Sequence, residues 1–258
     1  MFEKLGVQLY TVRDFLKDEE FANLAFKRLH ALGYTQAHTA GNPIDDAVLF
    51  SLAQKHGIDI IGSHYSFQKI TEEPKETMQV HRMWKTTNIG VGSMPMPARK
   101  DLAELKAFIA TMNRMAKIYS EEGFKLTYHN HSFEFVRMDG EKTIMDILID
   151  ELDPENISIV LDTCWVAAGG ADVNAWMRKL AGRIDILHLK DMALKEIDRR
   201  FVPQVCEVGH GNLDFDSIMD TAEEIGVKHY IVEQDENFVN TPFESLKMSA
   251  DFLAKYKV

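Results

Sequence analysis

A regular alternation of short apolar runs with amphipathic helical segments is the feature that most constrains this fold. Strand-like runs begin near residues 5, 34, 58, 88, 124, 157, 184 and 229, and a segment with helical spacing follows each. Strands joined through helices run parallel, and eight such units close a parallel sheet into a barrel. We therefore predict an α/β fold, a (β/α)8 TIM barrel, with one domain over residues 1–258.

Charge and composition narrow the classes of partner. The 29 basic and 40 acidic residues give a net charge of −11, whereas proteins that bind nucleic acid through its phosphates carry the opposite excess. We expect no nucleic-acid or membrane partner. The two cysteines, Cys164 and Cys206, form no zinc-binding pair, and the sequence has neither an evident signal peptide nor a run of about 18 apolar residues. A cytoplasmic protein is expected.

Metal-binding and proton-transfer residues gather where the predicted strands end. In parallel barrels all strand ends meet at one rim, which carries the active site. Asp162, His188 and Glu233 end three consecutive strands here. Two carboxylates and an imidazole suit an open site for one divalent ion, Mn, Mg, Co or Zn. The alternatives are a helix cap for Asp162 and a core position for His188.

The fifth predicted strand carries the most unusual segment, YHNHSFEF at residues 128–135. It should supply the fourth metal ligand. We predict Glu134 as a ligand or an acid/base, and His129 or His131 as a proton carrier or substrate anchor. The alternation of a strand puts both histidines on the same side. The alternative is a polar loop that merely caps the barrel.

Six further residues near the predicted rim are candidates for substrate binding. Trp165 could stack on a sugar face, and Lys190 could hold an anionic substituent. Ordinary packing and a Lys190–Asp191 ion pair are the alternatives. The other candidates are Tyr10 and His64 at the rim, and Glu207 and His210 in the long loop after the seventh strand.

Several blocks together resemble a known family. They are Tyr128-His129-Asn130-His131-x-x-Glu134-Phe135, Leu161-Asp162-Thr163, His188-Leu189-Lys190-Asp191 and Val208-Gly209-x-Gly211-x-Leu213-Asp214-Phe215. They resemble the sugar phosphate isomerase/epimerase family, a xylose-isomerase-like barrel group related to inosose dehydratases and endonuclease-IV-type barrels. The resemblance implies one divalent metal on strands five to eight, with Asp162, His188 and Glu233 at ligand positions. Glu134 would complete the set, with His131 in reserve.

The sequence departs from this family in places. His38 stands on strand two where relatives often have glutamate, and His210 stands where an acidic residue is frequent. Many relatives also place a glutamate inside strand five, where this chain has Thr127-Tyr128.

The predicted function is metal-dependent proton transfer on a sugar, keto-sugar or sugar phosphate. The metal would stabilise an enediolate, while Glu134 and Glu233 remove and return the proton, as in an isomerase or epimerase. If a hydroxyl leaves from the same intermediate, with His129 or His131 protonating it, the enzyme is a dehydratase. A sugar-binding barrel without turnover is a third hypothesis. The resemblance alone also allows a homo-oligomer.

Overall fold

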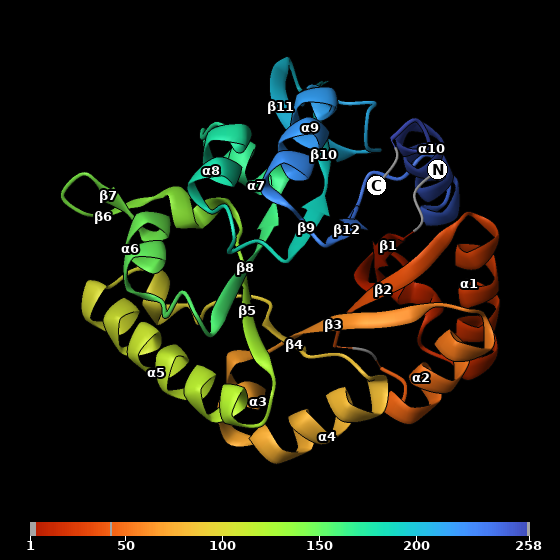
Figure 1. Ribbon diagram of the computed structural model, residues 1–258. Coiled ribbons are helices and arrows are strands. Elements are labelled where there is room, and N and C mark those ends of the chain that lie inside the picture. Colours follow the sequence, from red (N-terminus) through yellow and green to blue (C-terminus); the bar gives the residue numbers. More distant parts are fainter. Residues whose placement is uncertain (1–3, 42, 257–258) are drawn as a thin grey trace.

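Parallel strands closed into a barrel form the centre of the computed structural model, which describes residues 4–41 and 43–256. Residues 1–3, 42 and 257–258 of the predicted domain lie outside the described part. Eight of the described strands close in the order β1-β12-β9-β8-β5-β4-β3-β2, and helices surround them (Figure 1). The (β/α)8 prediction is confirmed. The barrel strands are β1 Leu5–Gln8, β2 Tyr34–Ala40, β3 Asp59–Tyr65, β4 Asn88–Val91, β5 Lys125–His129, β8 Ile157–Asp162, β9 Ile186–Leu189 and β12 His229–Val232.

The helices begin at polar capping residues. Asp18, Asp45 and Asp101 each accept hydrogen bonds from backbone N–H groups of the first turn that follows. Because Asp45 caps the second helix, that helix begins at Asp46. The described helices are α1 Glu19–Ala31, α2 Asp46–Lys55, α3 Phe67–Glu72, α4 Pro74–Trp84, α5 Leu102–Glu121, α6 Ile144–Glu151, α7 Thr163–Ala168, α8 Val173–Lys179, α9 Phe215–Ile225 and α10 Pro242–Leu253. None of them is long and apolar enough to cross a bilayer.

An apolar floor fills the barrel below its polar end. It consists of Ile61, Val160, Ile186 and Ile231, which form a small cluster separate from the main core between strands and helices. Alternate residues of a strand share a face, so the residue two positions after a floor residue also points into the barrel. On β8 and β9 those residues are Asp162 and His188. The sequence period thus places the polar side chains directly above an apolar support.

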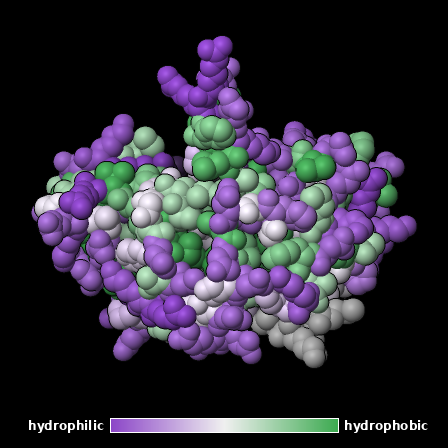
Figure 2. Space-filling model, turned by 90° about the horizontal axis from the view of Figure 1, so that it is seen from above, coloured by the Kyte–Doolittle hydropathy of each residue, from purple (hydrophilic) through white to green (hydrophobic). Residues whose placement is uncertain are grey.

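A long hairpin follows β9, where the sequence suggested only a connecting loop. Its strands, β10 Asp191–Ile197 and β11 Arg200–Cys206, pair antiparallel, and Asp198 and Arg199 both have positive φ in the turn (51° and 62°). Two such residues are typical of a tight hairpin turn. The hairpin exposes Leu194 and Phe201 (59% and 70%). Figure 2 shows one finger-like projection at the position that this hairpin has in Figure 1. The sequence also missed a short hairpin, β6 Arg137–Asp139 with β7 Lys142–Thr143, and the 3₁₀ segments Leu9–Phe15, Pro97–Arg99 and Ser132–Phe135.

At the opposite end of the barrel, Asp185 links two strands through ion pairs. Its carboxylate lies 2.9 Å from Lys125 Nζ and 2.6 Å from Lys228 Nζ. Burial raises the pKa of Asp185, but hydrogen bonds from Lys228 and Lys125 outweigh it, so the pKa falls below its usual value of 3.8. A carboxyl with a lowered folded pKa stabilises the protein above its unfolded pKa, and this stabilisation is lost as pH falls through the folded value.

Replacing Asp185 with asparagine should therefore lower the free energy of unfolding at pH 7 by about 1 kcal/mol, since both lysines are partly exposed. The difference from wild type should shrink as the pH drops below 4. Urea unfolding across this pH range measures both effects. Asp14→Asn is the control, because the Asp14–Lys17 pair lies in solvent and should matter little. A deficit that persists unchanged at low pH would contradict this assignment.

Candidate functional site

Four side chains converge above the apolar floor. They are His129 at the end of β5, Asp162 at the end of β8, His188 on β9 and Glu233 directly after β12. One nitrogen or oxygen atom from each lies within 4.8 Å of the others, and all four residues are buried. Strand register produces this group, because Asp162 pairs with His188 across β8 and β9. The Glu233 N–H donates to the Leu189 carbonyl, which aligns the third position.

A buried lysine lies between the two carboxylates of this group. Lys190 is 1% exposed, and its Nζ lies 3.2 Å from Asp162 Oδ2 and 3.1 Å from Glu233 Oε2. It also lies 2.8 Å from Asp235 Oδ2. The sequence suggested a local pair with Asp191. Asp191 instead accepts hydrogen bonds from the backbone N–H groups of the loop around Gly209 and Gly211.

Mutual electrostatics keep these groups charged. Burial alone would raise the pKa of Glu233, but the Lys190 ammonium and His188 hold that pKa well below its usual range. The pKa of Asp162 is likewise lowered, since Lys190 and His129 outweigh burial. Burial disfavours the Lys190 ammonium, yet the surrounding carboxylates raise its pKa well above the usual value. Asp162 and Glu233 are therefore ionised at neutral pH.

The group fits a divalent cation. Burial lowers the pKa of His129, but the polar contact with Asp162 and the charges of Glu233 and Asp162 raise it above its usual value. With His129 neutral, as a metal ligand must be, two carboxylates and one ammonium leave a net negative charge. The buried His129 Nε2 makes no hydrogen bond to a described residue, and it lies 3.6 Å from Asp162 Oδ2, the oxygen that also faces Lys190. Buried polar atoms are normally satisfied, so a nitrogen in this position suits a metal ligand. Carboxylate oxygens with imidazole nitrogens form a donor set suited to Mn, Co or Zn.

A cavity of about 380 Å³ opens above the cluster. Four of the six predicted substrate-binding residues line it, namely Tyr10, His64, Trp165 and Lys190. His131 also faces it, with its ring stacked on Phe133 at 5.4 Å between centroids. The remaining lining residues are Ala40, Gly92, His129, Glu233 and Asp235. The arrangement combines a charged floor with aromatic walls.

Two predicted substrate-binding residues lie elsewhere. Glu207 is buried outside the cavity, where it accepts hydrogen bonds from the Ser245 hydroxyl at 2.6 Å and the Gln234 amide at 3.2 Å. These bonds connect the loop after β11 to the loop after β12 and to α10. His210 is exposed and does not line the cavity. The sequence placed both in a loop over the pocket because the β10–β11 hairpin was not recognised.

The position of Glu134 does not support its predicted role as a metal ligand. It lies in the 3₁₀ turn Ser132–Phe135 and accepts hydrogen bonds from the Tyr128 hydroxyl at 2.6 Å and the His131 N–H at 2.8 Å. Tyr128 points away from the barrel interior, opposite to His129, and Glu134 follows it. Burial raises the pKa of Glu134 to about 7. His129, predicted as a proton carrier or anchor, occupies the strand-five position of the cluster. The three-residue spacing from His131 to Glu134 is typical of a capping box, so the sequence could have indicated that Glu134 caps this turn.

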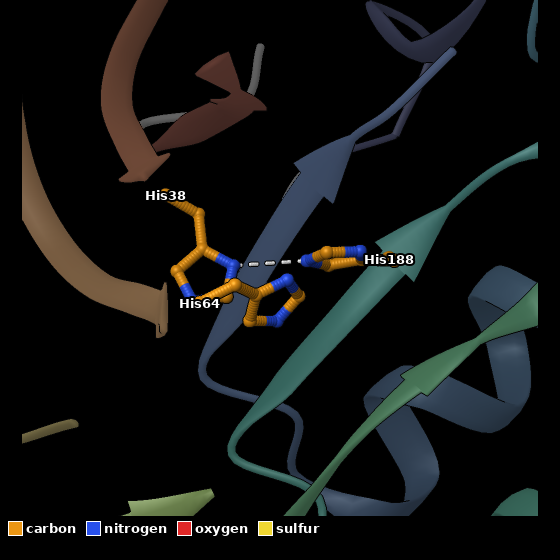
Figure 3. Close-up of side chains that lie close together, drawn as sticks. All are labelled: His38, His64 and His188. Atoms are coloured by element: carbon orange, nitrogen blue, oxygen red, sulfur yellow. Dashed lines mark hydrogen bonds between the residues drawn. The ribbon is translucent and has the colours of Figure 1, made fainter. Parts of the chain in front are cut away.

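A further imidazole lies inside the barrel. His38 on β2 is fully buried, and its Nδ1 lies 3.0 Å from His188 Nε2. Together with His64 and His188 it forms a second group, of three histidines (Figure 3). The sequence marks His38 only as a departure from the family on strand two, with no predicted role.

The opposite end of the barrel has its own cavity, of about 440 Å³. Several polar side chains that line this cavity form hydrogen bonds with neighbouring residues. Thr86 and Asn88 both donate to the Ile61 carbonyl, and His229 pairs with Gln36. In barrels of this type the active site lies at the carboxyl ends of the strands. We therefore place the functional site in the cavity above the histidines.

Comparisons with known proteins agree with this architecture. The family model described as "Xylose isomerase-like TIM barrel" matches residues 26–256. Inosose dehydratase from Geobacillus thermodenitrificans is 25% identical over 236 residues, which cover 78% of each chain. Inosose dehydratase 2 from Bacillus cereus is 28% identical over 55% of this chain and 51% of its own.

A solved structure extends the similarity over nearly the whole chain. The sugar phosphate isomerase/epimerase from Parabacteroides distasonis ATCC 8503 has 25% sequence identity and a TM-score of 0.79. The match covers 97% of this chain and 93% of that one. On the family match and the closed barrel, the protein belongs to the xylose isomerase-like TIM barrel family.

Proposed function

We propose that this protein is a lyase that removes water from a keto-polyol such as an inosose. The site would use one divalent cation held by His129, Asp162, His188 and Glu233. The observation that carries the proposal is the position of Glu134, which does not line the cavity. An isomerase that uses Glu134 and Glu233 on opposite sides of the substrate would lack Glu134, which instead bonds to Tyr128. His131, by contrast, faces the cavity. The similarity to inosose dehydratases supports the same reaction type.

His131 is the unprotonated imidazole that faces the cavity. Burial lowers its pKa to about 3, so it is neutral at pH 7 but only weakly basic, and proton transfer to it requires strong acidification of the substrate C–H bond. Stacking on Phe133 fixes the ring. A bound divalent cation would supply Lewis-acid polarisation of the substrate carbonyl, which acidifies the neighbouring C–H bond.

One residue can then complete the elimination. His131 takes the proton from the carbon beside the carbonyl, and the electron pair of that C–H bond forms a C=C bond. The C–O bond at the next carbon breaks, and the imidazolium returns its proton to the departing hydroxyl. Water is released and His131 is neutral again.

Two other cavity residues would fix the cluster carboxylates and the substrate. The Lys190 ammonium holds the Asp162 and Glu233 carboxylates in fixed positions, at 3.2 and 3.1 Å. Trp165 lies with its ring centroid 5.0 Å from Lys190 Nζ. Its ring offers a flat surface that could pack against the C–H face of a polyol and exclude water.

An isomerase or epimerase is the second candidate, favoured by the 25% identity to the Parabacteroides distasonis protein. Cation-loaded protein is incubated with a panel of inososes and keto-sugars in deuterated water, and products are analysed by mass spectrometry and NMR. We expect loss of one water. Deuterium incorporation with every hydroxyl retained would instead assign an isomerase. Neither change, with saturable binding of a panel member, would indicate the sugar-binding barrel.

His131 and Glu134 can be separated by substitution. His131→Phe keeps the stacked ring but removes the proton acceptor, so kcat should fall by about 10²–10⁴-fold. Glu134→Gln should reduce kcat by less than about 10-fold, because Glu134 only supports the turn. Initial rates of product formation measure both. The reverse order of effects would contradict the lyase and restore Glu134 as the acid/base.

A further inference from the structure

The His38–His188 pair connects β2 to the candidate metal centre from inside the barrel. His38 neither lines the cavity nor belongs to the four-residue cluster. It is fully buried, and Figure 3 shows its ring directed at His188, with the hydrogen bond between them. The hydrogen bond to His188 is therefore the direct link between His38 and the four-residue cluster.

Each ring nitrogen of His188 has one partner. Nδ1 lies 2.8 Å from Glu233 Oε2, and Nε2 lies 3.0 Å from His38 Nδ1. A neutral imidazole carries one N–H. A carboxylate can only accept, so in the structure as described the proton belongs on Nδ1. His188 Nε2 is then an acceptor, and His38 Nδ1 must donate to it, so the Gln8 amide nitrogen 3.4 Å from the same Nδ1 does not donate to that atom.

Cation binding through Nδ1 would reverse these roles. To bind a cation beside Glu233, His188 Nδ1 would need a free lone pair, which would put the proton on Nε2. His38 Nδ1 would then accept. Imidazoles that bind metals commonly donate their second N–H to a neighbouring group, which fixes the ring and its tautomer.

We propose that His38 is the positioning residue for His188, donating to it in metal-free protein and accepting from it in cation-loaded protein. This inference rests on the cation site of the proposed function. An imidazole can exchange donor for acceptor by changing tautomer, and an amide can do so by rotating. A carboxylate at this position could only accept, and an aliphatic side chain could do neither. The His38 Nε2 edge packs against β3, where a Cβ on Gly62 would lie 3.1 Å from Nε2.

His64 provides a matched comparison. Its ring lies 4.3 Å from His38 and 5.2 Å from His188 between centroids, and its polar neighbour is the Gln8 amide at 3.5 Å. It is therefore a nearby imidazole without the hydrogen bond to His188. The three histidines could alternatively bind a cation of their own. That arrangement would require the His188 Nε2 lone pair, which already faces His38.

The test compares zinc binding by metal-stripped full-length protein and three variants, measured by competition with a chromophoric chelator. His38→Leu should weaken zinc binding by about 10–100-fold. His38→Asn, which keeps a donor-or-acceptor group near the Nδ1 position, and His64→Leu should both stay close to wild type. Thermal unfolding of the metal-free variants establishes that each is folded. Equal affinities of wild type and His38→Leu would overturn this inference alone.

Ring-nitrogen NMR of ¹⁵N-histidine protein provides a second readout, with the His188 signals assigned from their loss in His188→Asn. We expect the His188 proton on Nδ1 without metal and on Nε2 with zinc. An unchanged tautomer would refute the inference. So would a second zinc equivalent lost in both His38→Leu and His64→Leu, which would assign a three-histidine site. Wild-type protein that binds no zinc would refute both this inference and the proposed cation site.

Discussion

Glu233→Gln should abolish tight cation binding and lower turnover by about 10³-fold. Glu233 Oε2 lies close to both His188 Nδ1 and Lys190 Nζ, at 2.8 and 3.1 Å. An amide of the same shape removes the charge that holds the cation. It also leaves only Asp162 of the two cluster carboxylates. Isothermal titration with Mn²⁺ and steady-state rates measure the two effects.

A matched control is available at the same end of the barrel. Glu207 is also a buried carboxylate, but its partners are Ser245 and Gln234 and it lies outside the cavity. Glu207→Gln should leave the stoichiometry and affinity of Mn²⁺ unchanged. If Glu233→Gln binds Mn²⁺ as wild type does, the four-residue cluster is not the cation site.

Lys190→Met should cause the largest loss of stability, about 3–5 kcal/mol in the metal-free protein. Methionine preserves most of the stem but leaves Asp162 and Glu233 buried without their ammonium partner. A divalent cation can replace the missing positive charge. Saturating Mn²⁺ should therefore raise the unfolding midpoint of Lys190→Met more than that of wild type. Urea unfolding with and without Mn²⁺ measures both quantities.

The control for this substitution is Lys247→Met, since the Lys247–Asp251 pair is exposed on α10 and should contribute little. A stable Lys190→Met protein, with no added stabilisation by Mn²⁺, would mean that Lys190 does not hold the two carboxylates in position. In that case the orienting role of Lys190 in the proposed function would also fall.

Much of the architecture could be predicted from the sequence because it depends on local periodicity. Helical and strand periods give the eight units, and strand ends give Asp162, His188 and Glu233 at one rim. The alternative for Asp162 also holds. Its Oδ1 caps α7 by accepting from the Trp165 N–H at 2.9 Å, while Oδ2 faces the cluster. One carboxylate serves both purposes with different oxygens.

The remaining features depend on contacts between distant segments. Glu134 lies only three residues beyond His131, yet a local turn directs it to Tyr128 and away from the barrel. Lys190 pairs with Asp235 and not with the adjacent Asp191. The bond between His38 and His188 joins residues 150 positions apart. Neither spacing nor composition specifies such pairings.

The apolar floor has a kinetic consequence. Ile61, Val160, Ile186 and Ile231 fill the lumen between the two end cavities, so a small polar molecule cannot pass through the barrel. In the proposed reaction, substrate would enter and product would leave through the same mouth. A product still in the cavity excludes the next substrate molecule, and turnover would slow as product accumulates. The four apolar side chains that support the polar cluster thus also close the inner end of the cavity.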